Sequence, residues 1–498
     1  MHHCLRITEI LHLIFGYLVD EKVTNTNVAG AIRHKDIAGL ARTCKAFMDP
    51  ALDILWRTQS SLSPLIMCLP AQFWTLTVDQ KDGVVSLMQE PSQEDWLTLK
   101  GYSRRIRAFN HTTLHLPSVC ENIVDIVFSP DLSDELFPSL HTLNITVLSG
   151  PLDPIQFLKY ARLPQLVRLR FMIPIFYRKW ASDLYFTPAS VPSLQALTII
   201  AAHAWTGVSA RLAVNFEQTP YLRSLYLSHS LYVLPSSLCE MIRLQFLCEL
   251  TVTLPEGFDV DVCPSMQPTL PSLQRIALTV RSLDQCTNLL SCVTSCELGS
   301  IGILHRSPAT QNDICQLFQE IGRICERYAD FHTLDIQCSH KNKLTAYPPF
   351  DLPRSMLTPF LACRRLRVLK LGSFGVLDIN DSFIAEITLA WPEIEALHLR
   401  GPKQGDALVT LEGVRELLRG CPRLQSLHMQ VDARILPKGE PEMQSISLTA
   451  LDISGSLMEV KTAVERYLKT LVPRLESLNM KLPRRPVMPV LVWPSSSP

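Results

Sequence analysis

The stretch VPSLQALTII, residues 191–200, decides the fold because the chain repeats its pattern many times. Aligned copies read P-x-L-x-x-L-x-[LIM], as in FPSLHTLNIT at 137–146 and CPRLQSLHMQ at 421–430. The last apolar positions of a copy alternate with other residues, which is the period of a strand with one buried face. The proline stands at the strand entry, where its missing N–H costs no ladder hydrogen bond. We therefore expect a short strand in each copy.

The repeats follow one another at intervals of about 28 residues, a period typical of solenoids. The first apolar anchors of the thirteen copies are Leu140, Leu166, Leu194, Leu222, Leu247, Leu273, Leu298, Phe331, Leu366, Ile394, Leu424, Leu448 and Leu475. Between anchors, NDICQLFQEIGRIC at 312–325 has the apolar spacing of a helix with one buried face, and Gly420 is a plausible helix stop. This pattern resembles leucine-rich repeats. The resemblance implies an α/β solenoid with a parallel concave sheet and outer helices.

The solenoid is expected to be irregular, because two steps between anchors are long. The polar, proline-bearing stretch at 339–355 predicts a protruding loop. The expected organisation is a helical module at 1–60, a connecting and capping region at 61–105, repeats at 106–482 and a proline-rich tail at 483–498.

Composition narrows the classes of partner. Lys+Arg and Asp+Glu number 47 each, so no net charge draws the chain to nucleic acid or to an anionic membrane, and we expect neither partner. The apolar run at 11–19 is too short to span a bilayer. The 15 cysteines are scattered singly, which favours unpaired core residues in a reducing compartment, the cytoplasm or the nucleus.

Residues 1–60 do not follow the repeat and predict three short helices. Ile7, Ile10, Leu11, Ile14, Phe15 and Leu18 form one helical stripe, and Ile37, Leu40, Ala41 and Cys44 form a second. A polar stretch at 19–36 separates them. In the third predicted helix, Asp49 is expected to be the N-cap and Pro50 to take the first helical position. Leu52, Leu55 and Trp56 are expected to form its apolar stripe.

The combination LRITEILHLIFGYL…LARTCKAFMDPALDILW resembles an F-box, and a module of this kind before leucine-rich repeats resembles fungal F-box proteins. The resemblance implies docking on the Skp-type adaptor of a cullin–RING (SCF) ubiquitin ligase. The chain has Thr8 where that family usually has proline and Phe47 where it often has tryptophan. The implied adaptor-binding residues are Ile7, Ile10, Leu11, Ile14, Phe15, Leu18, Leu40, Ala41, Cys44, Leu52, Leu55 and Trp56. The alternative is that these stripes only close the end of the solenoid, since terminal repeats need a cap.

No motif of an active site is present. We find no phosphate-binding glycine loop, no nucleophile elbow and no H-E-x-x-H, so we expect no catalytic residue, no metal ligand set and no cofactor. A hydrolase with an unrecognised site is the competing interpretation.

The concave face is where a partner is expected to bind, because strand residues between the anchors point away from the core. Its basic residues outnumber the acidic Glu249, Asp335 and Asp452, which favours an acidic or phosphorylated protein partner. An ordinary solvated sheet face is the alternative. The candidate substrate-binding residues are Arg168, Arg170, Tyr226, Lys370, His398, Arg400 and His428.

The sequence therefore predicts a non-enzymatic substrate receptor, with an F-box that docks on the adaptor and repeats that hold a target. A leucine-rich-repeat scaffold unrelated to ubiquitin is the second interpretation.

Overall fold

The structure is a computed structural model, and it divides into two compact units that we describe separately. Unit 1 comprises Met1–Pro255 and Thr269–Pro271, and unit 2 comprises Glu256–Pro268 and Ser272–Pro498. The residues that the structure describes are 7–19, 27–79, 82–111, 118–119, 123, 126–129, 131–146, 162–174, 184–186, 191–202, 210–228, 231–255, 270–291, 293–307, 309–328, 330–338, 351–372, 376–400, 409–437 and 445–481.

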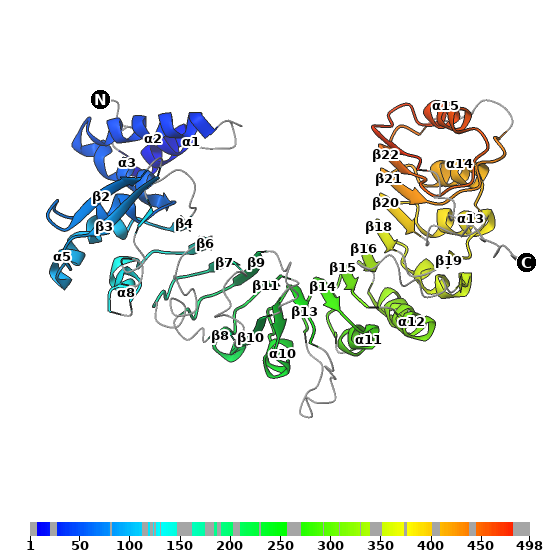
Figure 1. Cartoon of the computed structure of the whole chain (residues 1–498), viewed down its shortest axis with the longest axis horizontal. Helices are drawn as coiled ribbons and strands as arrows, with labels where there is room; N and C mark the ends of the chain where they lie inside the picture. The colour runs from blue at the N-terminus through cyan, green and yellow to red at the C-terminus, as the bar shows by residue number, and fades with distance from the viewer. Residues whose placement is uncertain are drawn as a thin grey trace, which may run out of the picture. The chain divides into compact units, whose positions relative to one another are not determined.

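Unit 1 begins with three helices, α1 (Thr8–Val19), α2 (Asn27–Ala41) and α3 (Lys45–Arg57) (Figure 1). Helix α2 begins at Asn27, so the predicted polar connection is shorter than expected. Helix α3 begins at Lys45 and runs through Pro50, so the predicted start at Asp49 and Pro50 is wrong. The Cys44 carbonyl accepts from two backbone N–H groups of the first turn, and this hydrogen bonding starts the helix before the proline.

The three helices share a small core. Leu11, Phe15, Ile37 and Ala51 are buried together, and the rings of Phe15 and Phe47 meet edge to face at 5.4 Å between centroids. Each helix is short, and mutual burial of these apolar residues supplies stability that isolated helices lack.

A parallel sheet follows directly, because α3 runs into its first strand. The in-register order is β1, β4, β6, β7, β9, β11, β13. The bounds of these strands are Thr58–Gln59, Ala108–His111, Thr142–Thr146, Arg168–Pro174, Ala196–Ala202, Ser224–Leu227 and Glu249–Thr253. A second parallel row pairs β8 (Leu184–Phe186), β10 (Ala210–Val214) and β12 (Leu231–Val233).

Smaller elements complete unit 1. An antiparallel hairpin of β2 (Trp74–Asp79) and β3 (Asp82–Leu87) carries the short strand β5 (Ser118–Val119) beside β3. The remaining elements are α4 (Ser63–Ile66), α5 (Gln93–Thr98), α6 (Lys100–Ser103), α8 (Ser133–Leu136), η5 (Phe216–Gln218) and α10 (Pro235–Ile242).

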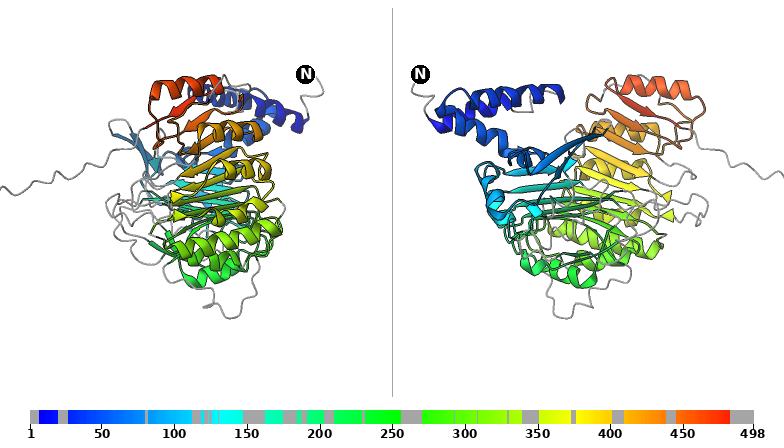
Figure 2. Two further views of the ribbon diagram at one scale, coloured as in Figure 1. Left: turned by 90° about the vertical axis from the view of Figure 1, so that its right-hand side faces the viewer. Right: turned by 60° about the vertical axis from the view of Figure 1, so that its left-hand side comes forward.

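Unit 2 is the more regular array, and its order is β14, β15, β16, β18, β20, β21, β22, β23, all parallel. The strands span Arg275–Val280, Ser300–His305, Thr333–Cys338, Val368–Gly372, Ala396–Arg400, Ser426–Met429, Ala450–Asp452 and Ser477–Asn479. Helices α11 (Leu283–Ser291), α12 (Gln311–Arg327), α13 (Asp381–Ala390), α14 (Leu411–Gly420) and α15 (Lys461–Leu471) lie on one side of these strands (Figures 1 and 2). We call the opposite side the open face.

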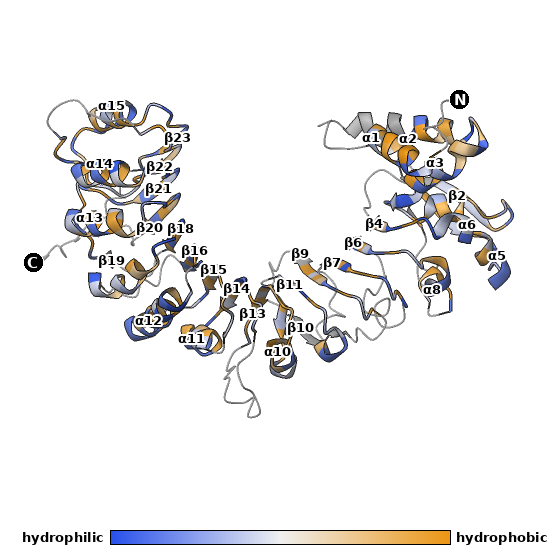
Figure 3. Ribbon diagram, turned by 180° about the vertical axis from the view of Figure 1, so that it is seen from behind, coloured by the Kyte–Doolittle hydropathy of each residue, from blue (hydrophilic) through white to orange (hydrophobic). Residues whose placement is uncertain are grey.

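The anchors of the repeat form the core between strands and helices. All of the predicted anchors are buried except Leu475, which is half-buried. Helix α12 buries its predicted face and carries polar residues outside, as the hydropathy colouring shows (Figure 3). Strand, turn and outer helix thus recur in register, which confirms an α/β leucine-rich-repeat-like fold.

Two expectations about unit 2 need correction. Residues 339–350 of the predicted loop lie outside the described residues, but Asp351–Leu352 form strand β17, which pairs with β19 (Val376–Leu377). Two 3-10 turns, η7 (Arg354–Met356) and η8 (Thr358–Ala362), then take the place of an outer α-helix. Gly420 is the last residue of α14 and not a stop beyond it.

The cysteines do not all stay unpaired. Cys325, near the end of α12, and Cys363, after η8, form a disulfide between neighbouring repeats, with 5.0 Å between their Cα atoms. That separation lies in the range that a disulfide requires. The expectation of single cysteines is wrong here because the two residues, 38 apart in sequence, meet only through repeat stacking. Cys286 and Cys421 are buried thiols, as expected.

Candidate functional site

Helix α1 has two apolar sides, and only one of them faces the module core. Leu11 and Phe15 point inward and are buried. Ile7, Ile14 and Leu18 are exposed, although the sequence placed them on the same stripe. The stripe is wider than the contact with α2 and α3, so part of it is left on the surface.

The exposed side of α1 is a candidate docking surface. Leu13 and Tyr17 are 65% and 79% exposed, and they stand beside the exposed Ile14 and Leu18 at helical spacing. We call Ile7, Leu13, Ile14, Tyr17 and Leu18 the α1 surface. Sequence reasoning missed Leu13 and Tyr17 because they fall outside the stripe that fills the core.

The other predicted adaptor-binding residues differ in how far their side chains are buried. Trp56 is buried, and its ring lies 5.0 Å from that of Tyr102, at the end of α6. This contact joins α3 to the capping region rather than offering a surface to a partner. The half-buried residues among the predicted set are Ile10, Leu40, Ala41, Cys44, Leu52 and Leu55.

An arginine fastens the module to the rest of unit 1. The Arg105 guanidinium forms ion pairs with Asp49, at 2.6 Å, and with Asp53, both on α3. Asp53 in turn lies 3.1 Å from His12 Nε2 on α1. Burial lowers the pKa of Arg105, but the hydrogen bonds and charges of the two carboxylates outweigh it and raise the pKa overall. The guanidinium therefore stays charged and holds α3 in place.

On unit 1 we also call the side of the sheet opposite the buried anchors the open face, and β7 carries two arginines there. Arg168 and Arg170 are both exposed on β7, and no ion pair joins either to another described residue. The in-register neighbours of Arg170 are Asn144 on β6 and Thr198 on β9, which are uncharged. Tyr226, two strands from Arg170, is 41% exposed.

The open face of unit 2 brings three predicted residues together. Lys370 is in register with His398, and His398 with His428. Arg400 lies on the same strand as His398, at β20, but its side chain is outside the described residues. Thus Lys370, His398 and His428 form one row across three strands.

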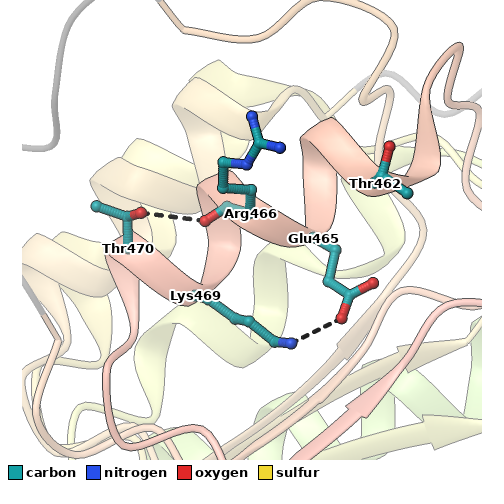
Figure 4. A pocket seen from close by; sticks show the side chains of 5 residues that line it. All are labelled: Thr462, Glu465, Arg466, Lys469 and Thr470. Carbon is teal, nitrogen blue, oxygen red and sulfur yellow. Dashed lines mark hydrogen bonds and ion pairs between the residues drawn. The ribbon is translucent and has the colours of Figure 1, made fainter.

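Within the described ranges, no three His, Cys, Asp or Glu side chains gather in a way that could hold a metal ion. A shallow pocket lies along α15, but it is lined by a single helix, and Lys469 is already paired with Glu465 at 2.8 Å (Figure 4). In the part of the chain that the structure covers, no helix has the length and apolar character to cross a bilayer.

Comparisons with known proteins add little to this geometry. No family model matches the chain, and no curated protein matches it in sequence. Among solved structures, an internalin from Listeria monocytogenes is similar to this chain with a TM-score of 0.34 and 12% identity, over 59% of this chain and 86% of that one. We draw no functional conclusion from a likeness of this extent.

Proposed function

We propose that the protein is the substrate-recognition subunit of an SCF-type ubiquitin ligase. In this proposal the α1 surface docks on a Skp-type adaptor, and through it on a cullin–RING ligase, while the open face of the repeats binds a target protein. The chemistry of ubiquitin transfer belongs to the partners, so the chain itself is not an enzyme.

The observation that carries the proposal is the α1 surface. Leu13 and Tyr17 are both more than half exposed on a helix whose opposite side already fills a core with Leu11 and Phe15. Contiguous apolar side chains on a soluble surface mark interaction sites. The resemblance of residues 5–56 to an F-box supplies the identity of the partner.

The attachment of the module supports the same role. Arg105 and the contact between Trp56 and Tyr102 fix α3 to the capping region, and β1 pairs with β4 immediately after α3. A receptor that presents a target must hold the adaptor-binding helices at a fixed position relative to the first repeats, and these contacts do so.

Target binding is assigned to the open faces. Arg168 and Arg170 on unit 1 are exposed and can pair with carboxylates or phosphates, because guanidinium groups bind such anions through two parallel hydrogen bonds. An acidic or phosphorylated segment of the target fits this site. Exchange of both arginines for glutamate is expected to abolish capture of such a segment at any pH between about 5.5 and 7.5, since arginine stays charged.

A second candidate function is a leucine-rich-repeat scaffold unrelated to ubiquitin. The continuity of α3 with β1 favours it, because that continuity makes the module a cap for the first strand. In this case the α1 surface has no adaptor to bind.

Co-purification with a Skp-type adaptor separates the two functions. We compare wild type with Leu13→Asp/Tyr17→Asp, and with the control Leu389→Asp, which places the same charge at a residue 85% exposed on α13. Loss of two anchors of this kind is expected to weaken binding by about 2 kcal/mol or more per residue. The module core is untouched, whereas charges at Leu11 and Phe15 would unfold it.

We expect the adaptor to be retained by wild type and by the control, and lost by the double variant. Failure of wild type to bind would favour the scaffold. Equal binding by all three proteins would mean that the adaptor uses a different surface.

A further inference from the structure

A row of basic residues lies along the edge of unit 1 at which its parallel strands begin. Arg57, Arg107 and His141 stand directly before β1, β4 and β6, and all three are exposed. Backbone hydrogen bonds of 2.9 Å join each of them to the next. Neighbouring parallel strands lie about 4.8 Å apart, so the basic residues follow one another closely. Arg168, the first residue of β7, continues the row beside His141.

The arginines of this edge are not neutralised within the part of the chain that the structure describes. The other residues that directly precede in-register strands of this sheet are Val167, Gln195, Arg223 and Cys248. No carboxylate is among them. Neither Arg57, Arg107 and Arg168 nor the exposed Arg223 forms an ion pair with another described residue.

The carboxylates closest to this row along the chain are engaged elsewhere. Asp49 and Asp53 on α3 pair with Arg105. Glu249, the one acidic residue of the in-register strands, lies on β13 and accepts a hydrogen bond from the Ser224 hydroxyl at 3.1 Å. The positive charge of the row is therefore open to an anion from outside the chain.

The edge at which the strands of unit 2 begin is built differently. Arg365 pairs there with Asp330, and Arg423 Nη1 lies 3.4 Å from Glu393 Oε1. In each pair the carboxylate belongs to the preceding repeat, so neighbouring repeats neutralise one another. Unit 1 has cations at this edge without the matching carboxylates, which is the charge pattern of a surface that receives an acidic partner.

Two exposed aromatic rings lie at the other end of the same edge. Tyr221 and Phe246 directly precede the buried anchors of two neighbouring repeats, and they are 57% and 46% exposed. The rings are stacked, with 6.2 Å between their centroids and 27° between their planes. Aromatic and arginine side chains are enriched in protein interfaces and carry much of their binding energy. We call the basic row and this aromatic pair together the entry edge, which comprises Arg57, Arg107, His141, Arg168, Tyr221, Arg223 and Phe246.

We infer that the entry edge binds an extended segment of a partner protein, with carboxylates at one end and apolar side chains at the other. The in-register strands from β1 to β13 span roughly 29 Å at about 4.8 Å a step, and an extended chain rises about 3.3 Å per residue, so about nine residues cover the edge. The basic residues gather at the β1 end, where the carboxylates would lie. Tyr221 and Phe246 at the β13 end would contact the apolar side chains.

The distribution of charge along the edge favours a protein segment over a nucleic acid. A nucleic acid carries a phosphate at every nucleotide, whereas the cations are interrupted between Arg168 and Arg223 by Gln195, which is exposed and uncharged. A segment whose own charge changes along its length matches this pattern.

This inference goes beyond the proposed ligase role. The entry edge contains no residue of the α1 surface, and it shares only Arg168 with the proposed target site on the open face. Substitutions at Arg57 and Arg107 therefore test the entry edge alone, and their outcome is distinct from that of the adaptor experiment.

The test uses the full chain and a fluorescein-labelled peptide of about nine residues, with glutamates in one half and leucine and phenylalanine at the opposite end, whose binding is followed by fluorescence anisotropy. A second peptide has the reversed sequence, because the edge does not fix the direction of the segment. The variant is Arg57→Gln/Arg107→Gln. Its matched control, Arg365→Gln/Arg367→Gln, removes the same charge from the strand-entry edge of unit 2, where both arginines face carboxylates.

We expect wild type and control to bind one of the two peptides with equal affinity, and Arg57→Gln/Arg107→Gln to bind it about 5- to 30-fold more weakly. The affinity of wild type should fall as salt rises from about 0.05 to 0.5 M, and that of the variant should fall less. Equal binding by variant and control, or no binding of either peptide by wild type, overturns the inference. Tighter binding of a single-stranded oligouridylate than of the peptide, at the same salt concentration, overturns the choice of a protein partner.

The aromatic end is tested by Tyr221→Ala/Phe246→Ala. This protein should bind the peptide at least about 10-fold more weakly than wild type does. It should bind a peptide with serines in place of leucine and phenylalanine as wild type does, because the contact that the substitutions remove is then already absent. An equal loss with both peptides contradicts the assignment of the aromatic pair.

A second measurement keeps the inference testable if a double variant does not fold. Wild type is cross-linked to the peptide with benzoylphenylalanine in place of its phenylalanine, and the attached fragments are identified by mass spectrometry. We expect attachment to fragments that contain Tyr221 or Phe246. Attachment only to other parts of the chain contradicts the inference.

Discussion

Arg105→Met removes the charged head that joins the helical module to unit 1 and keeps most of the stem. The Arg105 side chain is only 10% exposed, and it pairs with Asp49 and Asp53. Its Nε also donates to the Gly101 carbonyl at 3.1 Å. We expect the substitution to loosen α3 without unfolding the repeats.

The magnitude follows from the exposure of each partner. Asp49 is largely exposed, so its ion pair contributes about 0.5 kcal/mol. Asp53 is less exposed and contributes about 1 kcal/mol, and the Gly101 carbonyl contributes about 1 kcal/mol. The sum is a loss of about 2–3 kcal/mol in the local stability of α3, which corresponds to roughly 30- to 150-fold faster hydrogen exchange in this helix.

Hydrogen exchange followed by mass spectrometry measures this opening in peptides that cover 45–57, without requiring two-state unfolding of the whole chain. The control is Arg323→Met, because the i, i+3 pair of Arg323 with Glu320 involves a guanidinium side chain 68% exposed and should change the stability of α12 by less than about 0.5 kcal/mol. Acceleration of α3 below about threefold would refute the reasoning, because it would place the Arg105 contacts in the class of exposed pairs.

Two further predictions concern the packing of unit 2. Gly420→Ala should lower the free energy of unfolding by about 1–3 kcal/mol, because the new Cβ would lie 2.4 Å from Thr388 Cβ, and the measurement is a fall in the thermal midpoint. The control Gly101→Ala has open space at its Cβ and should leave the midpoint nearly unchanged. Equal effects of the two substitutions would contradict the packing argument. Burial raises the pKa of the Cys421 thiol to about 12, so at about pH 8 iodoacetamide should leave Cys421 unmodified in the native protein and alkylate the exposed Cys296, which peptide mass mapping detects. Modification of Cys421 at the rate of Cys296 would show that the thiol is not buried.

The repeat was predictable because its signal is redundant. Leu194 and Leu197 look ordinary alone, but the same spacing recurs at every copy, and each copy buries its anchors by stacking on its neighbours. The helix that buries Ile314 and Phe318 was equally visible, since its apolar residues recur over four turns. Periodicity that persists over many residues leaves little freedom for a different fold.

Features decided by tertiary contacts could not be predicted. The sequence presents Gly420 as a helix stop, but its role is to let α14 approach Thr388 on α13. The start of α3 before Pro50 is of the same kind, because packing against α1 and α2 overrides the local preference of Asp49 and Pro50 for a helix start.

The candidate site was likewise predictable from the sequence only in part. The sequence indicated which strands carry charge on the open face, but not that His398 and His428 stack or that Lys370 has a carboxylate neighbour. On α1, periodicity placed Leu11 and Ile14 on one stripe. Only the angle at which α2 and α3 approach α1 decides that Leu11 is buried and Ile14 is exposed.

The disulfide between Cys325 and Cys363 closes a covalent ring within unit 2. A protease that cuts once anywhere inside this ring does not separate the chain into two pieces, because the bond still joins the ends. On a denaturing gel the nicked protein would migrate as one chain until a reductant is added, and then as two fragments. An unfoldase that threads one end of the chain through a narrow pore could not pull this ring through as a single strand. It would have to pass two strands of chain side by side, or stall until the bond is reduced.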